Sequence, residues 1–183
     1  MSASDPGPAS AFLLRHRDAL AATAELGPVA DLACGRGRNA VELARSGRTV
    51  IGLDRSGVAL AELRVRAAAA GAPVLPVRTD LESGAAIPLR PGSCGAVVVV
   101  RYLHRPLCAG LARLLAPGGL LLYETFTQAQ ASLPYGPENP LFLLEPDELP
   151  RLFPGLAVVA AEEGFFEDGR RWALSRLLAR REG

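Results

Sequence analysis

The chain has 183 residues, of which 49% are hydrophobic and 21% are charged, and its formal net charge is +1. This composition is that of an ordinary globular domain, and it lacks the global basic excess of proteins that bind nucleic acid by charge. All 20 basic residues are arginine, which excludes mechanisms that need lysine, such as a Schiff base or a Walker A phosphate-binding loop.

The three cysteines, Cys34, Cys94 and Cys108, have no CxxC spacing. Neither a disulfide framework nor a metal site is therefore predicted. The first residues lack the basic-then-apolar order of a signal peptide, and the longest apolar runs are too short to span a bilayer. We expect a cytoplasmic protein that is not inserted in a membrane.

Short apolar runs alternate with amphipathic stretches along most of the chain, after a predicted loose tail at residues 1–10. The predicted helices are residues 11–26, 38–46, 57–70, 106–115 and 146–153. The predicted strands are residues 29–33, 49–53, 74–78, 96–100, 120–125, 156–164 and 171–179. We expect residues 1–183 to form a single domain.

This alternation predicts an α/β fold with a doubly wound sheet covered on both faces. Only about six residues separate the last two strands, which is too few for a parallel crossover. We therefore expect a mostly parallel sheet that ends in an antiparallel hairpin. Residues 170–181, which contain the last predicted strand, have arginines at both ends, which favours an edge strand at that position.

Residues 128–145 are predicted to be a lid loop. This segment contains Pro134, Tyr135, Gly136, Pro137 and Pro140 and directly follows a predicted strand. Long irregular loops in compact domains commonly form lids or binding loops.

The turn after the first predicted strand has the sequence DLACGRGRNA, residues 31–40. Gly35 and Gly37 allow a ligand to approach the backbone closely at the carboxyl end of the strand. The pattern fits the GxGxxA turn of dinucleotide-binding proteins. It also fits S-adenosylmethionine. Asp31 would be a good partner for the cationic amino-acid end of that ligand and a poor one for a pyrophosphate. The turn alone leaves both ligands open.

Two further acids follow successive strands. Asp54 ends the second strand, where a carboxylate can accept hydrogen bonds from ribose hydroxyls. Asp80 follows the third strand, where it can accept from the adenine amine while the Leu81 amide donates to a ring nitrogen. Each acid alone could be a capping or turn residue, but three in this order favour a nucleoside-type ligand.

These features together resemble the class I S-adenosylmethionine-dependent methyltransferases. The resemblance is carried by DLACGRGRNA, GLD at Asp54, TD at Asp80, a β-branched strand and APGGLLLYE, and it covers about residues 29–179. It implies a seven-stranded Rossmann-like sheet with an antiparallel last strand. The chain is similar to the tellurite-resistance type of this family in the sequence GRN at residues 37–39 and in its compact size.

The resemblance implies S-adenosylmethionine as cofactor and S-adenosylhomocysteine as product. It places the methionine part at the first turn, the ribose at Asp54 and the adenine at Asp80 and Leu81. The full set of implied cofactor-binding residues is Asp31, Ala33, Gly35, Gly37, Asn39, Asp54, Arg55, Asp80, Leu81 and Arg101.

Arg101 and His104 are the catalytic candidates, because both follow the fourth strand, where the methyl group and the acceptor would meet. His104 is suited to proton transfer near neutral pH, although a structural hydrogen bond would equally explain it. Arg101 and Arg105 are predicted to bind an anionic group of the acceptor. The sequence RYLHRP lacks the (N/D)PP(Y/F) motif of many nucleic-acid amino-methyltransferases.

We expect a methyltransferase that acts on a small molecule, at a thiol, a chalcogen oxyanion, a hydroxyl or an amine. RNA or protein methylation is the first alternative. An NAD(P)-binding oxidoreductase and a non-catalytic S-adenosylmethionine-binding protein are the others. We expect no nucleic-acid or membrane partner, and a monomer or a homodimer.

Overall fold

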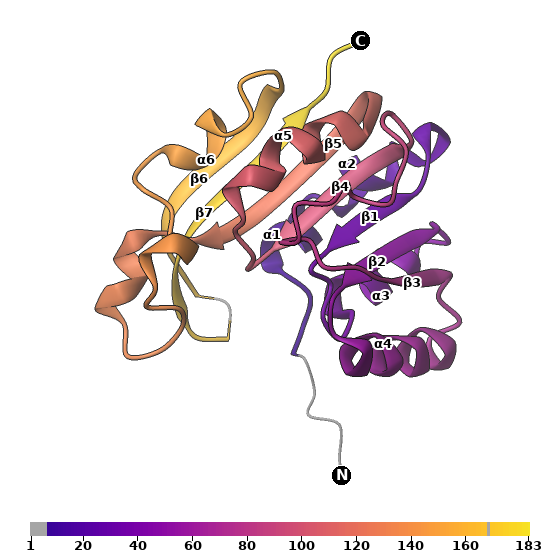
Figure 1. The fold of residues 1–183 in the computed structure, drawn as a ribbon, viewed down its shortest axis with the longest axis horizontal. Helices are drawn as coiled ribbons and strands as arrows, with labels where there is room; N and C mark the ends of the chain where they lie inside the picture. The colour runs from indigo at the N-terminus through magenta and orange to yellow at the C-terminus, as the bar shows by residue number, and fades with distance from the viewer. Residues whose placement is uncertain (1–6, 168) are drawn as a thin grey trace.

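The computed structural model describes residues 7–167 and 169–183. Seven strands form a single sheet in the order β3-β2-β1-β4-β5-β7-β6 (Figure 1). The strands are β1 (Val29–Leu32), β2 (Val50–Asp54), β3 (Val74–Arg78), β4 (Cys94–Val100), β5 (Leu115–Phe126), β6 (Ala157–Glu167) and β7 (Arg171–Arg180).

The direction of the strands confirms the predicted fold class. Strands β3, β2, β1, β4 and β5 are parallel to one another. Strand β7 is antiparallel to both β5 and β6. The order reverses between β1 and β4, which lie side by side, and ligands bind at such switch points in open α/β sheets.

The predicted edge position of the last strand is wrong. Strand β7 lies between β5 and β6, so the edge strand is β6. Residues 172–179 of β7 are buried, whereas residues of β6 alternate between exposed and half-buried. A run that is buried on both faces is typical of an interior strand, and the terminal arginines do not outweigh it.

Helices cover both faces of the sheet. One face packs against α1 (Ala11–Arg15), α2 (Arg17–Ala21), α3 (Arg38–Ala44) and α4 (Gly57–Ala69). The other packs against α5 (Cys108–Leu114) and α6 (Glu148–Arg151). The short 3₁₀ helices are η1 (Ala24–Leu26), η2 (Arg105–Leu107), η3 (Gln128–Ser132) and η4 (Pro140–Phe142).

The predicted helix at residues 11–26 is instead three short helical pieces, α1, α2 and η1. Arg48 accounts for the end of this segment. Its buried guanidinium donates to the carbonyl oxygens of Leu20, Thr23 and Gly27 and to the Thr23 hydroxyl. These carbonyls turn toward one cation instead of continuing an α-helix.

The predicted loose tail is only partly described, because residues 1–6 lie outside the described residues. The end of this tail is not loose. Ala9 and Ser10 are buried, and Ser10 caps α1 and donates from its backbone amide to Oδ1 of Asn39 at 3.0 Å. Ala9 and Ser10 therefore lie beside the first turn of α3.

The segment between β5 and β6 is closed at its base. Gln128 donates to the carbonyl oxygen of Leu144, and Leu144 donates to that of Phe126, both at 2.9 Å. The buried Gln130 side chain joins this segment to β7 by accepting from the Ala173 amide at 3.0 Å. Residues 128–145 thus form an ordered loop at the carboxyl edge of the sheet, and their role as a lid stays a prediction.

Candidate functional site

The turn after β1 exposes its backbone at the carboxyl edge of the sheet. Ala33, Gly35 and Gly37 all have positive φ angles, 53°, 54° and 80°. A Cβ atom on Gly35 would meet no atom within 4 Å, whereas one on Gly37 would overlap the side chain of Leu63 in α4. Gly35 therefore offers an open surface to a ligand, and Gly37 allows α3 and α4 to pack closely.

Asp31 lies beneath this turn in β1 and is 1% exposed. It accepts a hydrogen bond from the Ala40 amide, and its Oδ2 atom has no hydrogen-bond partner among the described residues. Burial raises the pKa of this carboxyl from 3.8 to about 7, against the opposing effect of Arg38. An unpaired buried oxygen fits a site that receives a cation.

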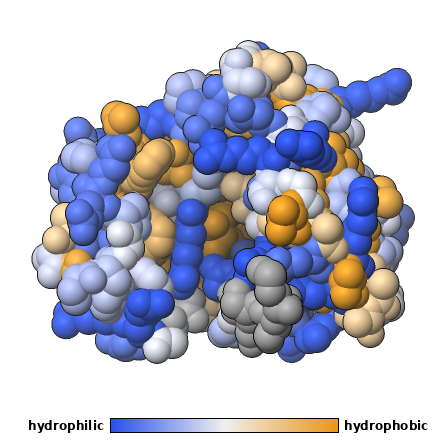
Figure 2. Space-filling model, turned by 60° about the horizontal axis from the view of Figure 1, so that its bottom comes forward, coloured by the Kyte–Doolittle hydropathy of each residue, from blue (hydrophilic) through white to orange (hydrophobic). Residues whose placement is uncertain are grey.

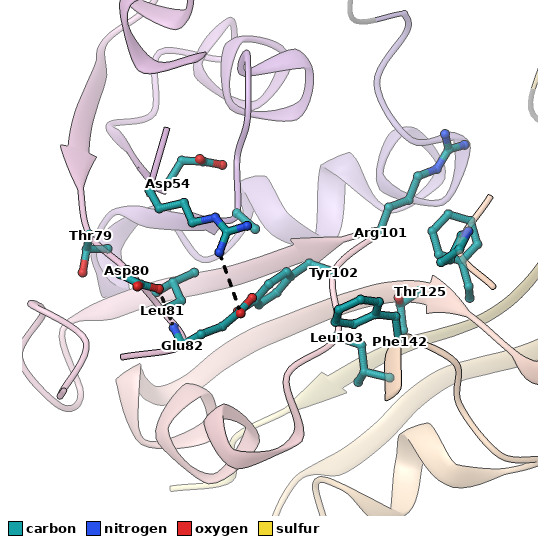
Figure 3. Close-up of a pocket in the computed structure, with 14 residues that line it drawn as sticks. Asp54, Thr79, Asp80, Leu81, Glu82, Arg101, Tyr102, Leu103, Thr125 and Phe142 are labelled. Carbon is teal, nitrogen blue, oxygen red and sulfur yellow. Dashed lines mark hydrogen bonds and ion pairs between the residues drawn. The ribbon is translucent and has the colours of Figure 1, made fainter. Parts of the chain in front are cut away.

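Asp54 joins the ends of β1 and β2. Its Oδ2 atom accepts from the Gly35 amide, and its Oδ1 atom accepts from the Ser56 amide, both at 2.8 Å. The same carboxylate lines the larger of two neighbouring cavities at this edge (Figure 3). The aspartate thus fixes the first turn and faces the ligand space.

The two cavities have volumes of about 440 Å³ and about 310 Å³, and Ala33 and Arg101 line both. Most of the predicted cofactor residues line one or the other. The larger cavity is lined by Ala33, Asp54, Arg55, Asp80, Leu81 and Arg101 of that set, and the smaller by Ala33, Gly35, Asn39 and Arg101. Asp31 and Gly37 line neither.

The loop after β3 forms the acidic end of the larger cavity. Asp80 accepts from the Glu82 amide at 3.0 Å, and Glu82 pairs with Arg55 at 3.9 Å (Figure 3). Asp80 therefore accepts a hydrogen bond within the turn, as an ordinary turn residue does, and it also lines the cavity. Thr79 and Glu82 also line it and were missed, because nothing in their spacing separates them from ordinary loop residues.

Arg101 lies where the two cavities meet. Its φ is 58°, and its amide donates to the carbonyl oxygen of Glu124 at 2.7 Å, which holds the end of β4 beside β5. Its guanidinium carbon lies 4.3 Å from the centre of the Trp172 ring. The structure thus places a cation at the predicted position, packed on an aromatic ring.

His104 lies three residues after Arg101 and lines neither cavity. It is half-buried at the start of η2, where its carbonyl oxygen accepts from the Leu107 amide at 3.0 Å. Its role as a base stays a prediction. Arg105 does not fit the predicted anion-binding role, because its guanidinium is engaged by Glu148 and two backbone carbonyls.

The far wall of the larger cavity comes from residues outside the predicted cofactor-binding and catalytic sets. It is formed by Tyr102, Leu103, Thr125, Phe126, Pro137 and Phe142. Figure 3 shows Thr125 and Phe142 at the opposite end from Asp54 and Asp80. Pro137 and Phe142 belong to the irregular segment after β5, where no periodicity could indicate the direction of a side chain.

Two absences hold for the part of the chain that the structure describes. No group of three or more His, Cys, Asp and Glu side chains there could hold a metal ion. No helix in residues 7–167 and 169–183 combines the length and the apolar character that crossing a membrane requires.

Comparison with known proteins places this geometry in a family. Residues 29–119 match the methyltransferase domain family. The match begins at β1 and ends within β5, so it contains the first turn, Asp54, Asp80 and Arg101. A search among curated proteins found no match.

Solved structures with the same fold include several methyltransferases. TehB from Haemophilus influenzae has a TM-score of 0.71 and 20% identity, over 91% of this chain and 62% of TehB. An S-adenosylmethionine-dependent methyltransferase from Mesorhizobium loti has a TM-score of 0.68 and 20% identity, over 91% of this chain and 97% of its own. Magnesium protoporphyrin IX methyltransferase from Synechocystis, with bound S-adenosylmethionine, has a TM-score of 0.66 and 18% identity, over 93% of this chain and 78% of its own.

The residues present also fit the cofactor that this family uses. The open surface at Gly35, the unpaired oxygen of Asp31 and the carboxylate of Asp54 lie around one switch point of the sheet. The matched segment, the strand order and this set of groups lead to one assignment. The chain contains a methyltransferase domain at residues 29–119, within the fold of solved S-adenosylmethionine-dependent methyltransferases.

Proposed function

We propose that this enzyme methylates a small molecule bound in the larger cavity. The observation that carries the proposal is the division of this cavity, with Asp54 and Asp80 at one end and Thr125 and Phe142 at the other. One end suits the nucleoside of the cofactor, and the other leaves a walled space for an acceptor. The volume of about 440 Å³ is within the range of small-molecule sites.

The residues of the chain would hold the cofactor along the carboxyl edge. Asp54 would accept from the ribose hydroxyls, Asp80 and Leu81 would flank the adenine, and the surface at Gly35 would receive the methionine part. When bound, S-adenosylmethionine supplies a methyl group on a sulfonium, and the acceptor's electron pair bonds to that carbon as the C–S bond breaks, leaving S-adenosylhomocysteine. The residues contribute mainly by positioning and by excluding water.

Arg101 is our candidate for positioning the acceptor, since it lines both cavities. A thiol needs little further help, because its deprotonated form is a strong nucleophile. A hydroxyl or an amine would need a base, and His104 is proposed for that role. Its side chain would have to reach a cavity that it does not line in this structure.

The other acceptors remain proposals of lower rank. The tellurite-resistance type is supported by the likeness to TehB, but 20% identity indicates the fold alone. Magnesium protoporphyrin IX methyltransferase is named for a small molecule, which supports the class of acceptor and not its identity. RNA or protein methylation finds less support in a walled cavity. We also propose that the enzyme acts in the cytoplasm, without a nucleic-acid or membrane partner.

The first test is a calorimetric titration of the protein with S-adenosylhomocysteine, with NADH as the competing ligand. We expect micromolar binding of S-adenosylhomocysteine, no binding of NADH, and a loss of at least about tenfold in affinity in Asp54→Ala. Asp18→Ala is the matched control, because the Asp18 side chain is 98% exposed and lines neither cavity. Preferential binding of NADH would overturn the proposal.

A screen of acceptors then follows, with thiols, phenols, selenite and tellurite. Mass spectrometry detects the methylated product together with an equal amount of S-adenosylhomocysteine. Methylation of RNA or protein in place of all the small molecules would contradict the proposed class of acceptor.

A further inference from the structure

The charges of the larger cavity are separated from its apolar surface. Its lining contains three carboxylates, Asp54, Asp80 and Glu82, against two guanidiniums, Arg55 and Arg101. Arg55 pairs with Glu82 at the cofactor end. Figure 2, which brings this side of the molecule forward, shows a hollow with a hydrophobic floor and hydrophilic rims. Among the described residues that line this cavity, Arg101 is thus the one charged group outside the cofactor end, and the other residues of the acceptor end are uncharged.

Phe142 is an unusual part of the apolar wall. Its side chain is 46% exposed, although the next residue, Leu143, is 2% exposed. The backbone around Phe142 is nevertheless fixed on both sides, because the carbonyl oxygens of Leu141 and Leu143 both accept from the Arg105 guanidinium at 2.9 Å. The aromatic ring is thus held at the cavity without being buried by the protein.

Arg105 is itself held by Glu148. The two side chains form a bidentate ion pair at 2.6 Å and 2.8 Å, and Glu148 also accepts from the Glu145 amide at 2.8 Å. The pair raises the pKa of Arg105 and lowers that of Glu148, through the hydrogen bonds between them. A bidentate pair fixes direction as well as distance. Arg105 therefore determines where the loop presents Phe142.

The same end of the cavity contains a hydroxyl that no described residue satisfies (Figure 3). Thr125 is 1% exposed, lines the cavity, and its Oγ1 atom has no hydrogen-bond partner among the described residues. A buried unpaired hydroxyl is costly, so a polar atom at this end of a bound ligand would be stabilised there.

From these four features we infer the class of acceptor and a residue that determines specificity. The acceptor is an uncharged, apolar molecule about the size of one or two aromatic rings, bound between Phe126 and Phe142, with its hydroxyl or thiol near Thr125. As the group's electron pair takes the methyl group, a thiol loses its proton to solvent and a hydroxyl loses its proton to His104, the base proposed above. Arg105 is a positioning residue, which acts through the backbone of Phe142. This inference rests on the proposed function.

The test is calorimetry on the full chain saturated with S-adenosylhomocysteine. The probes are 2-naphthol, its anionic analogue 2-naphthoate, and tellurite. We expect 2-naphthol to bind at least about tenfold more tightly than either anion. Tighter binding of 2-naphthoate or tellurite would overturn the inference.

Variants locate the probe. We expect Phe142→Ala to weaken 2-naphthol binding about tenfold and Thr125→Val about three- to tenfold, while Thr125→Ser stays close to wild type. Phe165→Ala removes a ring that is also half-exposed but lies on β6, and it should change nothing. Equal affinity in wild type, Phe142→Ala and Thr125→Val would contradict the site.

Arg105→Gln and Glu148→Gln test the positioning role. Both should weaken 2-naphthol binding several-fold without changing the affinity for S-adenosylhomocysteine, and Arg105→Lys should fall between them and wild type. Once an acceptor is found, both should raise its KM with kcat within about threefold. Failure to bind S-adenosylhomocysteine would refute the proposed function. Binding of S-adenosylhomocysteine without 2-naphthol would refute only this inference.

Discussion

Gly37 packs directly against Leu63 of helix α4, so closely that a methyl group on Gly37 would overlap the Leu63 side chain. Gly35, in the same turn, has no atom within 4 Å of the position that its Cβ would take. Both have a positive φ. One motif thus contains a glycine required by packing and another that leaves open space at the carboxyl edge of the sheet.

The first prediction separates these two glycines. Gly37→Ala should lower the free energy of unfolding by about 2–4 kcal/mol, because backbone strain and overpacking add together. Gly35→Ala should lower the free energy of unfolding by the backbone strain alone, about 1–2 kcal/mol. It should, however, weaken S-adenosylhomocysteine binding at least about tenfold. Urea unfolding and calorimetry measure the two effects. The reverse pattern would show that the two glycines have been assigned the wrong roles.

The second prediction concerns Asp31, whose pKa is raised by burial from 3.8 to about 7. Between these values the native protein holds a proton that the unfolded chain has lost, so the free energy of unfolding falls as pH rises through this window. Asp31→Asn removes that dependence. Relative to the variant, wild type should lose about 2–3 kcal/mol between pH 5 and pH 8.

Urea unfolding of both proteins at pH 5, 6, 7 and 8 checks this difference. Asp18→Asn is the control, since the Asp18 side chain is 98% exposed, and its profile should follow that of wild type. Parallel profiles for wild type and Asp31→Asn would mean that the Asp31 carboxyl has no raised pKa.

The third prediction concerns the buried ion pair between β5 and β7. Nε of Arg176 donates to Glu124 at 2.7 Å, and the two side chains are 5% and 0% exposed. Arg176→Met leaves the Glu124 charge buried, and we expect a loss of about 3–5 kcal/mol in the free energy of unfolding. The double variant Glu124→Leu with Arg176→Met should recover more than half of that loss.

A double-mutant cycle by urea unfolding measures this coupling. Arg17→Met serves as the control, because the Arg17 side chain is 68% exposed and its loss should change stability by less than about 0.5 kcal/mol. Additive losses in the cycle would mean that the two charges do not depend on each other.

The fourth prediction concerns Arg48, which binds the carbonyls at the end of the N-terminal helical segment. Arg48→Met should cost about 2–4 kcal/mol, because several buried acceptors lose their donor. Hydrogen exchange should accelerate most in residues 20–27. Arg45→Met removes an arginine that is 64% exposed, and unchanged exchange is expected there. Equal exchange rates for residues 20–27 in Arg48→Met and Arg45→Met would contradict the structural role of Arg48.

Local patterning was sufficient for the architecture. Alternating apolar runs and amphipathic stretches predicted the strands and most helices, because burial on both faces of a parallel sheet requires such runs. The short connection before β7 predicted its antiparallel direction, since no crossover could fit. Asp54 and Asp80 could be assigned because parallel strands bring their carboxyl ends to one edge.

The sequence alone determined the fold class and the position of Asp54 and Asp80 at the carboxyl edge, because each of these follows from the pattern of a strand and the turn after it. Only the tertiary structure decided what lies at the opposite end of the larger cavity. Phe142 reaches the cavity because Arg105, thirty-odd residues earlier, binds its neighbouring carbonyls. Likewise, β7 is interior because its buried run pairs with β5 and β6 at once. Contacts between distant segments carry no periodic signal, so no spacing in the sequence could have indicated them.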